Sequence, residues 1–501
     1  MAWAARFARH TDGMRPRNRL MVCAGLGAAA ALGQAPVNAW PVTLVALALL
    51  YGLFARSAGW RASALQGWAA GTGYFMLALS WIVEPFLVDI ARHGWMAPVA
   101  LLFMAGGLAL FWALGWALAR LAGGGAMAWI GALVLAEALR GTALTGFPWA
   151  QIGHVWIATP ILHWAAYGGA LALTALTALT AVALWWGLAG RRWMAVPVLV
   201  VVAVLFAGGG VVHPSPPVPD GAPTVRLVQP NAPQHQKWDP ALMPVFYQRQ
   251  LAFTRAGQRP DLIVWPETAV PVMLGRAAPV FAEISDAAGA VPVVVGLRRR
   301  SRQRLHNSMV ALDPAGKVGA LYDKHHLVPF GEYVPFGDAL SRFGITGLAA
   351  RQGHGYSPGP GAQVIGLGPV GRALALICYE GVFPRDVAAA PERPDFMLLI
   401  TNDAWFGQVS GPYQHLAQAR LRSAEQGLPM VRVANTGVSA MIDATGRVTA
   451  RIPLGRADWR DAPLPAALPP TPYAVTGDWP MLVLAAALLA VAGRRRRANS
   501  D

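Results

Sequence analysis

The amino-acid sequence predicts a polytopic helical membrane protein that carries one large inserted α/β domain. Its 501 residues are 55% hydrophobic and only 13% charged, which is about half the roughly 25% of soluble proteins. The low charge is uneven, because residues 18–212 and 478–493 contain long apolar runs whereas residues 213–477 have a globular composition. We therefore expect membrane helices in 1–212, a soluble domain in 213–477, and a last membrane helix with a basic tail in 478–501.

The apolar runs predict about eight membrane-spanning helices, because a bilayer core about 30 Å thick requires roughly 20 apolar residues per helix. The expected spans are 18–35, 40–55, 64–82, 96–119, 126–140, 160–189, 193–212 and 478–493. The first span has an arginine-rich start and an Ala/Gly core, which is also typical of a signal peptide, so whether this segment is retained stays open.

The net charge of +16 comes largely from arginines that flank the apolar runs. With a cytoplasmic N-terminus, nearly every arginine-bearing short loop and the arginines at 494–497 fall in the cytoplasm, as the positive-inside rule requires. The same topology places residues 213–477 on the outer side. The sequence has no ribonucleoprotein motif and no zinc finger, so we do not expect nucleic-acid binding.

Two ionisable residues, Glu137 and Arg140, lie near the outer end of the fifth expected span. An ionisable group at membrane depth is a functional candidate. Alternatively, the two residues form a pair on one helix face that orients the helix. Their role stays open.

Residues 213–477 begin with a stiff proline-rich linker and then alternate short apolar runs with helical patterns. Strands are expected at 224–230, 261–265, 291–297, 307–312, 372–378, 396–402 and 430–442, and helices at 240–257, 277–288 and 411–427. Several strands are nearly continuous apolar runs, typical of strands covered on both faces. This pattern predicts a layered α/β domain with helices outside a sheet core.

Three residues at or just beyond expected strand ends are candidates for a thiol-based acyl-transfer site. Cys378 is the only cysteine of the polar domain, Glu267 follows a Trp-Pro pair, and Lys324 opens a loop rich in Pro, Gly and Phe. A cysteine attacks a carbonyl as thiolate and needs a base, for which Glu267 is the candidate. Lys324 and the backbone N–H of Tyr379 could stabilise the oxyanion, and Glu332 could hold Lys324 charged.

Each of these residues also has a purely structural interpretation. Cys378 could be a small buried hydrophobe, Glu267 a turn or helix-cap acid, and Lys324 a surface charge. His325 and His326 are adjacent and lack the spacing of metal ligands. We expect neither a metal nor a cofactor.

Several motifs taken together resemble the nitrilase superfamily, whose triad is Glu-Lys-Cys. The triad motifs are Trp265-Pro266-Glu267, the run at 324–332, and Cys378-Tyr379-Glu380. The run HLVPFGEYVP at 326–335 is similar to the membrane branch of that superfamily, the apolipoprotein N-acyltransferases. So are the segments at 236–240, 401–406 and 435–437, and, in the membrane part, 145–149. The resemblance covers nearly the whole chain.

The resemblance implies a nitrilase-like αββα sandwich in the periplasm, attached to a multi-pass bacterial inner-membrane domain. It implies that Glu267 is the general base, Lys324 the oxyanion stabiliser and Cys378 the nucleophile. The supporting residues would be Glu332, Tyr379 and Glu380, with Trp238 as a mobile aromatic lid. Phe147 and Trp149 are expected to line a lipid access route at the membrane interface.

The implied reaction is ping-pong and needs no cofactor. Cys378 would take an acyl chain from a phospholipid, typically phosphatidylethanolamine, and the thioester would acylate the α-amino group of a diacylglyceryl-cysteine at the N-terminus of an apolipoprotein. We expect a monomer. The alternatives are a membrane-tethered amidase that hydrolyses a small C–N substrate, and a transporter with a ligand-binding outer domain. Acyl-chain length, headgroup preference and client lipoproteins stay open.

Overall fold

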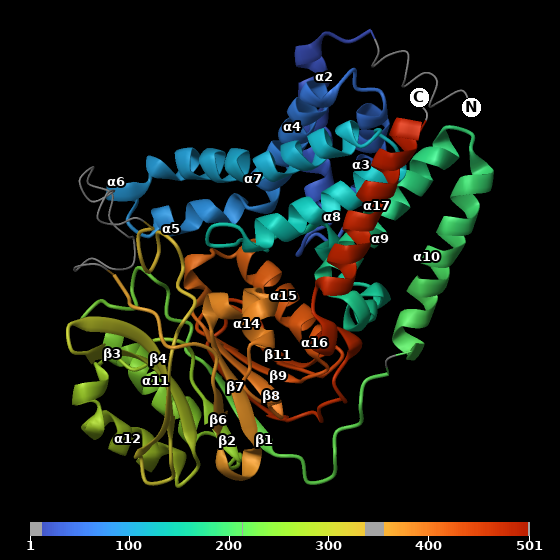
Figure 1. Cartoon of the computed structure of the whole chain (residues 1–501). Helices are drawn as coiled ribbons and strands as arrows, with labels where there is room; N and C mark the ends of the chain where they lie inside the picture. The colour runs from blue at the N-terminus through green and yellow to red at the C-terminus, as the bar shows by residue number, and fades with distance from the viewer. Residues whose placement is uncertain (1–12, 213, 336–354, 499–501) are drawn as a thin grey trace. The chain divides into compact units, whose positions relative to one another are not determined.

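The computed structural model of the chain describes residues 13–212, 214–335 and 355–498. It divides into two compact units, one formed by Met1–Pro214 with Thr471–Asp501 and the other by Ser215–Pro470 (Figure 1). Two terminal stretches of the expected membrane segments lie outside the described residues, namely 1–12 and 499–501. His213, the first residue of the expected soluble domain, also lies outside them. The two units are described separately below.

The first unit is helical, and a helix occupies each of the eight expected spans. These helices are α2 (Pro16–Ala31), α3 (Trp40–Ala55), α4 (Trp60–Ala78), α7 (Met96–Leu121), α8 (Ala126–Thr142), α9 (Ala165–Leu188), α10 (Arg192–Val212) and α17 (Trp479–Ala498). Short helices connect them: η1 (Ser80–Val83), α5 (Glu84–Leu87), α6 (Ile90–His93), η2 (Ile152–Trp156), η3 (Pro160–Trp164) and α16 (Pro472–Thr476).

Three helical stretches are long and apolar enough to cross a bilayer: Met96–Leu121, Pro160–Leu188 and Arg192–Val211. The pair Trp60–Ala78 and Ser80–Leu87, bent by 63°, would be a fourth if it forms one span. Helices α2, α3 and α8 have 16, 16 and 17 residues, fewer than the roughly 20 that a bilayer core requires. The expected count of about eight spans therefore stays a prediction.

Small residues let the helices of this unit approach closely. A Cβ at Gly73 of α4 would lie 1.9 Å from the carbonyl oxygen of Ala24 in α2, and a Cβ at Gly71 would lie 3.0 Å from Ala109 in α7. A larger side chain at Gly73 would therefore push α2 and α4 apart. Such contacts between small residues are typical of helix packing in membranes.

The two charges of α8 pair with each other inside this unit. Arg140 Nη2 lies 2.5 Å from Glu137 Oε2 and both side chains are buried, while the indole N–H of Trp112 donates to Glu137 at 2.6 Å. Arg140 also donates to the carbonyls of Phe147 and Trp149. These contacts support the interpretation of a structural pair, which here anchors the loop that follows α8.

The second unit contains two six-stranded sheets, with strand orders β12-β1-β2-β3-β4-β5 and β11-β10-β9-β8-β7-β6. The strands of the first sheet are β1 (Thr224–Gln229), β2 (Leu262–Val264), β3 (Val293–Ser301), β4 (Arg304–Leu312), β5 (Val318–Asp323) and β12 (Asp458–Pro463). Those of the second are β6 (Val364–Gly366), β7 (Arg372–Ile377), β8 (Phe396–Thr401), β9 (Met430–Ala434), β10 (Ser439–Ile442) and β11 (Val448–Ile452). The central strands β1, β2 and β3 are parallel, as are β7, β8 and β9.

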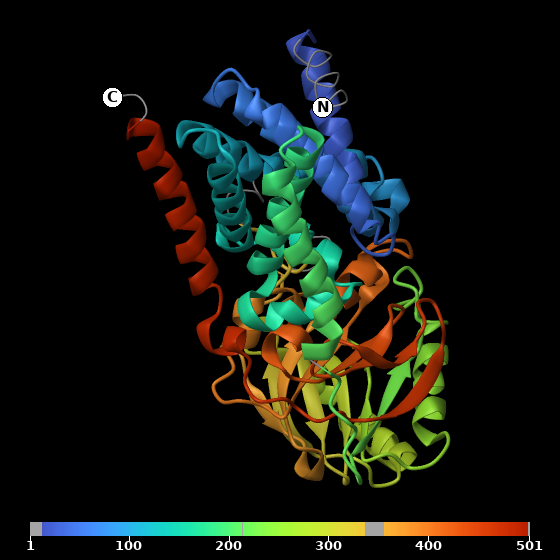
Figure 2. The same ribbon diagram turned by 90° about the vertical axis from the view of Figure 1, so that its right-hand side faces the viewer.

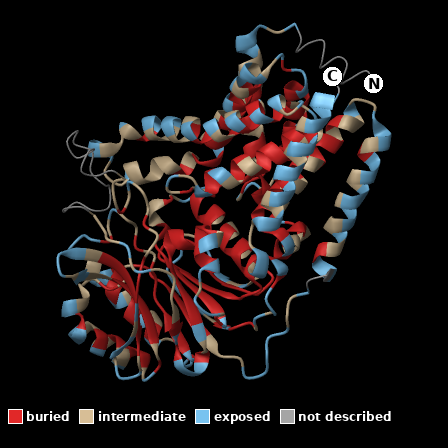
Figure 3. Cartoon of the chain, viewed as in Figure 1, coloured by how far each residue is buried: buried red, intermediate tan, exposed pale blue. Residues whose placement is uncertain are grey.

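Helices cover the outer face of each sheet. Leu251 of α11 (Met243–Arg255) and Ile284 of α12 (Ala278–Ala288) share one buried cluster with the first sheet. Val387 of α14 (Pro384–Ala388) and Ala419 of α15 (Gly411–Gln426) share another with the second. The strands of both sheets are seen from a second direction in Figure 2, and most of their residues are buried (Figure 3).

The two sheets face each other. Ser439 of β10 donates a hydrogen bond to Gln229 of β1 at 2.6 Å, so the inner layer carries polar contacts as well as apolar packing. The order helices, sheet, sheet, helices confirms the expected α/β sandwich.

Each expected strand overlaps an observed one, with one correction. The run 430–442, expected as one strand, is two antiparallel strands, β9 and β10. The chain reverses at residues 435–438, where a Cβ at Gly437 would lie 2.2 Å from Asp403 Oδ2. Only a glycine therefore fits where the turn passes Asp403.

Candidate active site

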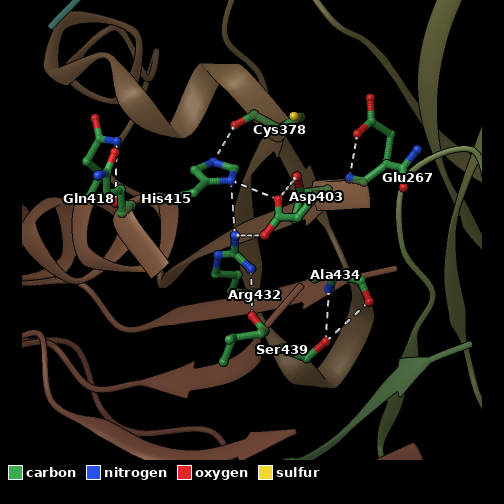
Figure 4. Close-up of polar contacts among 12 residues, drawn as sticks. Glu267, Cys378, Asp403, His415, Gln418, Arg432, Ala434 and Ser439 are labelled. Atoms are coloured by element: carbon green, nitrogen blue, oxygen red, sulfur yellow. Dashed lines mark hydrogen bonds and ion pairs between the residues drawn. The ribbon is translucent and has the colours of Figure 1, made fainter. Parts of the chain in front are cut away.

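Three side chains at strand ends of the second unit meet in one buried polar cluster. Glu267 follows β2, Lys324 follows β5 directly, and Cys378 follows β7 directly. All three are buried and lie within electrostatic range of one another. In Figure 4 the sulfur of Cys378 points to the side on which Glu267 lies.

Two hydrogen bonds hold the Glu267 carboxylate in place. Oε1 accepts from the side-chain amide of Asn307 at 2.6 Å, and Oε2 accepts from the backbone N–H of Asn402 at 2.7 Å. Burial raises the pKa of Glu267 above its ordinary value, although the nearby Lys324 opposes this effect. A carboxylate with a raised pKa is a better base near neutral pH.

Lys324 forms a buried ion pair with Glu332. The Nζ–Oε2 distance is 2.7 Å, and the Glu332 carboxylate also accepts from the N–H of Val328 at 2.8 Å and from Asn307 at 3.1 Å. Burial alone would lower the pKa of Lys324, but Glu332, Cys378 and Glu267 more than offset it, and the pKa is raised. Lys324 is therefore a fixed positive charge and not a proton acceptor.

Cys378 stands at the start of η7 (Cys378–Val382) with a backbone φ of 53°, which is unfavourable for a residue with a Cβ. Burial, followed by the charge of Glu267, raises the pKa of the Cys378 thiol, while Lys324 lowers it. The resting side chain is therefore a thiol. Nucleophilic attack then requires a base to accept the proton as the reaction proceeds, and Glu267 is the nearby carboxylate.

Asn307 of β4 joins these groups, and the sequence reasoning missed it. Its Nδ2 donates to both Glu267 and Glu332, and its backbone carbonyl accepts from the N–H of Lys324 at 2.9 Å. The only local signal was a polar Asn-Ser pair inside an apolar strand. That signal does not reveal which groups the amide would contact.

Glu380 accepts hydrogen bonds from residues on both sides of the site. The fully buried Glu380 accepts from the N–H of Ile377 at 2.6 Å, from Tyr322 at 2.7 Å and from the N–H of His325 at 2.8 Å. Burial alone would raise the pKa of Glu380, but its hydrogen bonds hold the pKa below the ordinary value. Glu380 thus stays ionised and fixes the backbone before the nucleophile.

Trp238 is 37% exposed, and two basic side chains lie near its ring. The guanidinium of Arg298 lies 4.6 Å and the Nζ of Lys237 5.6 Å from its ring centroid. Lys237 donates to the backbone carbonyl of Glu267 at 3.1 Å and to Thr268 at 2.8 Å. Burial lowers the pKa of Lys237 to about 8.

A small, partly open pocket lies beside the turn that carries Glu267. Lys237 and Trp238 line it together with Met243, Phe246, Tyr247 and the residues flanking Glu267. Lys237 thus contacts both Trp238 and the turn that carries Glu267.

Phe147 and Trp149 belong to the helical unit, in the loop that Arg140 anchors. Phe147 is half-buried, whereas Trp149 is only 1% exposed and packs against Trp81, with ring centroids 4.7 Å apart and the ring planes tilted by 41°. Trp149 is thus a packing residue of its own unit. A role for these two residues in lipid access stays a prediction.

The cluster can perform acyl transfer through a thioester. It combines a thiol, a carboxylate and a fixed ammonium group, which are the parts required for nucleophilic catalysis at a carbonyl. Within the described ranges, no group of three His, Cys, Asp or Glu side chains could hold a metal ion. By itself this geometry does not distinguish water from an amine as the final acceptor.

The polar domain and the helical part of the chain each match a model of a known protein family. Residues 224–462 match the model of the carbon-nitrogen hydrolase family, and residues 26–183 match that of the apolipoprotein N-acyltransferase N-terminal domain. A protein of Rhodopseudomonas palustris named apolipoprotein N-acyltransferase is 37% identical over 96% of this chain and 95% of its own length. One of the same name from Bradyrhizobium diazoefficiens is 38% identical over 96% of each chain. A solved carbon-nitrogen hydrolase superfamily protein from Xanthomonas campestris is 22% identical with a TM-score of 0.37, covering 48% of this chain and 90% of its own.

Proposed function

Because the chain belongs to the apolipoprotein N-acyltransferase family, we propose that it transfers an acyl chain from a phospholipid to the N-terminal diacylglyceryl-cysteine of apolipoproteins. Membership in this family rests on 37% identity over 95% of a relative's length, and it confirms the resemblance seen in the motifs. The observation that supports the chemistry most directly is the buried cluster of Glu267, Lys324 and Cys378. We propose these three residues as the catalytic triad.

In the first half-reaction, Cys378 Sγ attacks the ester carbonyl of the phospholipid while Glu267 accepts the thiol proton. The ammonium of Lys324 and the N–H of Tyr379 stabilise the oxyanion, which is typically worth a few kcal/mol per donor. The ester C–O bond then breaks, and Glu267 returns the proton to the departing lysophospholipid oxygen. The acyl group remains on sulfur as a thioester.

In the second half-reaction, the α-amino nitrogen of the acceptor attacks the thioester. A C–N bond forms and the C–S bond breaks. Glu267 accepts the proton of the attacking amine and passes it to the departing sulfur, which restores the thiol. The amine must be neutral to attack, because a protonated amine has no lone pair to donate.

We further propose that the protein is a monomer in the bacterial inner membrane, with about eight spans and the unit Ser215–Pro470 in the periplasm. Phosphatidylethanolamine is the expected donor, and Phe147 and Trp149 the expected contacts for incoming lipid. A site that opens to the outer leaflet spares the exposure of an acyl chain to water, which costs about 0.8 kcal/mol per CH₂. The arginines that flank the apolar runs support this orientation.

Hydrolysis of a small C–N substrate by a membrane-tethered amidase is less well supported. That activity would need only the carbon-nitrogen hydrolase domain and one anchor, whereas residues 26–183 match the N-terminal domain of the acyltransferases. The two activities differ in what discharges the thioester. A thioester that persists in water and is discharged by a lipopeptide amine supports the transferase, and rapid discharge by water supports the amidase.

The proposal is tested by intact mass spectrometry of the purified full-length protein incubated with phosphatidylethanolamine. We expect the mass of one acyl chain to be added to the wild-type protein and to Cys23→Ala, and no addition to Cys378→Ala. Cys23 is a matched control because it is the other free buried cysteine and lies in α2 of the helical unit. An adduct on Cys378→Ala, or none on the wild type, would refute the proposed reaction.

A further inference from the structure

Three charged or titratable side chains lie behind the nucleophile and take no part in the steps above. Asp403, His415 and Arg432 are each at most 1% exposed, and they come from η8 (Asp403–Trp405), α15 and β9. Figure 4 shows the ring of His415 between the Cys378 carbonyl and the Asp403–Arg432 pair. We call these three residues the support cluster.

The Asp403 carboxylate has partners other than His415. Arg432 Nη2 donates to Asp403 Oδ2 at 2.7 Å, and the hydroxyl of Thr401 donates to Oδ1 at 2.8 Å. Arg432 is held in turn by a 2.6 Å hydrogen bond from Nη1 to the carbonyl of Val438. The buried ion pair is therefore fixed without a proton from the ring of His415.

The ring of His415 has different neighbours at its two nitrogens. Nε2 lies 3.2 Å from the carbonyl oxygen of Cys378. Nδ1 lies 3.0 Å from Arg432 Nη2 and 2.9 Å from Asp403 Oδ1. A carbonyl oxygen only accepts hydrogen bonds, so the contact with Cys378 is favourable only if Nε2 carries the hydrogen.

Arg432 makes this tautomer possible. Nη2 has two hydrogens, and with one directed to Asp403 the other is available for Nδ1 of His415. In a neutral ring with hydrogen on Nε2, Nδ1 is an acceptor and can take it. Without Arg432, Nδ1 would face only the Asp403 carboxylate and would carry the hydrogen. The lone pair of Nε2 would then repel the carbonyl oxygen of Cys378. Burial lowers the pKa of His415, which agrees with a neutral ring.

We propose that Arg432, fixed by Asp403, sets the tautomer of His415 so that its Nε2–H holds the Cys378 carbonyl and thereby aims the Tyr379 N–H at the reacting carbonyl. The peptide unit between Cys378 and Tyr379 is planar, and in a trans peptide the C=O and N–H bonds point in opposite directions. A carbonyl turned toward His415 therefore turns the N–H of Tyr379 to the opposite side. His415 and Arg432 are positioning residues for the oxyanion hole.

The backbone of Cys378 needs such a restraint. Its φ of 53° lies in the left-handed region, where residues with a Cβ persist only when their surroundings hold them. Before the nucleophile, Glu380 holds the N–H of Ile377 at 2.6 Å. After it, the hydrogen bond from His415 holds the carbonyl. Loss of the second restraint would let the peptide rotate and turn the N–H of Tyr379 away from the oxyanion.

Two substitutions of His415 separate positioning from packing. The amide nitrogen of His415→Gln can reach the place of Nε2 and still donate to Cys378, whereas that of His415→Asn reaches only the place of Nδ1. Deletion of one oxyanion-hole donor typically lowers kcat about 100- to 1000-fold. Since the N–H of Tyr379 would be misdirected and not deleted, we expect about a 10- to 100-fold slower acyl-enzyme formation for His415→Asn. For His415→Gln we expect a loss of less than about threefold.

The measurement is single-turnover formation of the thioester from phosphatidylethanolamine by the full chain, with the melting temperature of each variant as a control for folding. Equal losses in both variants, or no loss in either, would overturn the proposal. Only the kinetic test of this inference depends on the proposed function. A wild-type protein that forms no thioester would contradict the proposed function, while the tautomer can still be measured.

Nitrogen-15 NMR of wild-type protein labelled at histidine provides that measurement and requires no variant to be active. The signal of His415 is assigned by its disappearance in His415→Gln. A neutral ring protonated at Nε2 is the expected result. A ring protonated at Nδ1, or at both nitrogens, would overturn the role assigned to Arg432.

Discussion

Replacing Asn307 with alanine should move the acid limb of the acylation rate profile to higher pH. In the proposed mechanism Glu267 works as a carboxylate, so the rate should fall as the pH drops through the pKa of this group. The amide of Asn307 donates to Glu267 Oε1 at 2.6 Å and stabilises the ionised form. Without that hydrogen bond the raised pKa of Glu267 rises further, and the loss of rate begins at a higher pH.

The size of the shift follows from the contact. A hydrogen bond to a charged group contributes about 1.5–3 kcal/mol, and one pKa unit corresponds to about 1.36 kcal/mol. We therefore expect a shift of about one to two units. The rate at high pH should fall by less than about tenfold, because the 2.7 Å pair of Lys324 with Glu332 and the bond from the Lys324 N–H to the Asn307 backbone remain.

The assay is single-turnover thioester formation, measured by intact mass spectrometry between about pH 4 and pH 9, a range that begins at about the ordinary pKa of a glutamate carboxyl group and extends well above it. Ser308→Ala is a matched control, since the neighbouring residue of β4 donates a 2.6 Å hydrogen bond to Asp323. This control should lower the melting temperature and leave the acid limb in place. An Asn307→Ala profile that overlays the wild type, or an equal shift in both variants, would refute the reasoning.

Other substitutions test the remaining contacts. Glu332→Gln should lower kcat/KM for acylation about 10- to 150-fold, as expected from loss of a charge-assisted bond worth about 1.5–3 kcal/mol. The reason is that Lys324, Val328 and Asn307 all donate to this carboxylate. An unchanged value would show that the pair does not hold Lys324. Trp238→Ala should slow lipid exchange while a maleimide reagent labels Cys378 as in the wild type, and an equal loss of labelling would contradict a lid role. Arg298→Gln should slow exchange only about two- to fivefold, as loss of one cation–π contact implies; an effect as large as that of Trp238→Ala would indicate another role. Discharge of a preformed thioester by a lipopeptide should accelerate as the pH rises through about 8, the usual range of an α-amino group, and a flat profile would exclude a neutral amine as the attacking group.

The local pattern of the sequence located most of the secondary structure. Apolar runs and period-two alternation report burial directly, so helices lie at all eight expected spans and strands at all seven expected positions. The four strands outside those positions, β5, β6, β11 and β12, are short and partly exposed, and their sequences carry little apolar signal. The turn that divides 430–442 lies at Asn435-Thr436-Gly437, a polar, glycine-containing segment that is typical of a turn and that the prediction of one strand overlooked.

The candidate catalytic residues could be chosen because each combines an unusual residue type with a strand end. A lone cysteine, an acid after Trp-Pro and a lysine opening a loop are visible without coordinates. Their ionisation states are not visible. The raised pKa of Glu267 and the charged state of Lys324 depend on burial and on neighbours contributed by other strands.

The sequence alone therefore predicted the apolar and polar segments, the α/β class and the three candidate catalytic side chains, because these predictions depend on residue type and short-range pattern. Tertiary structure alone decided that Asn307 joins Glu267 to Glu332, and that Nε2 of His415 lies 3.2 Å from the carbonyl oxygen of Cys378. The partners in these hydrogen bonds are 25 to 40 residues apart. Contacts over such separations are fixed by the packing of the two sheets and their helices, and no local pattern of residues encodes which donor meets which acceptor.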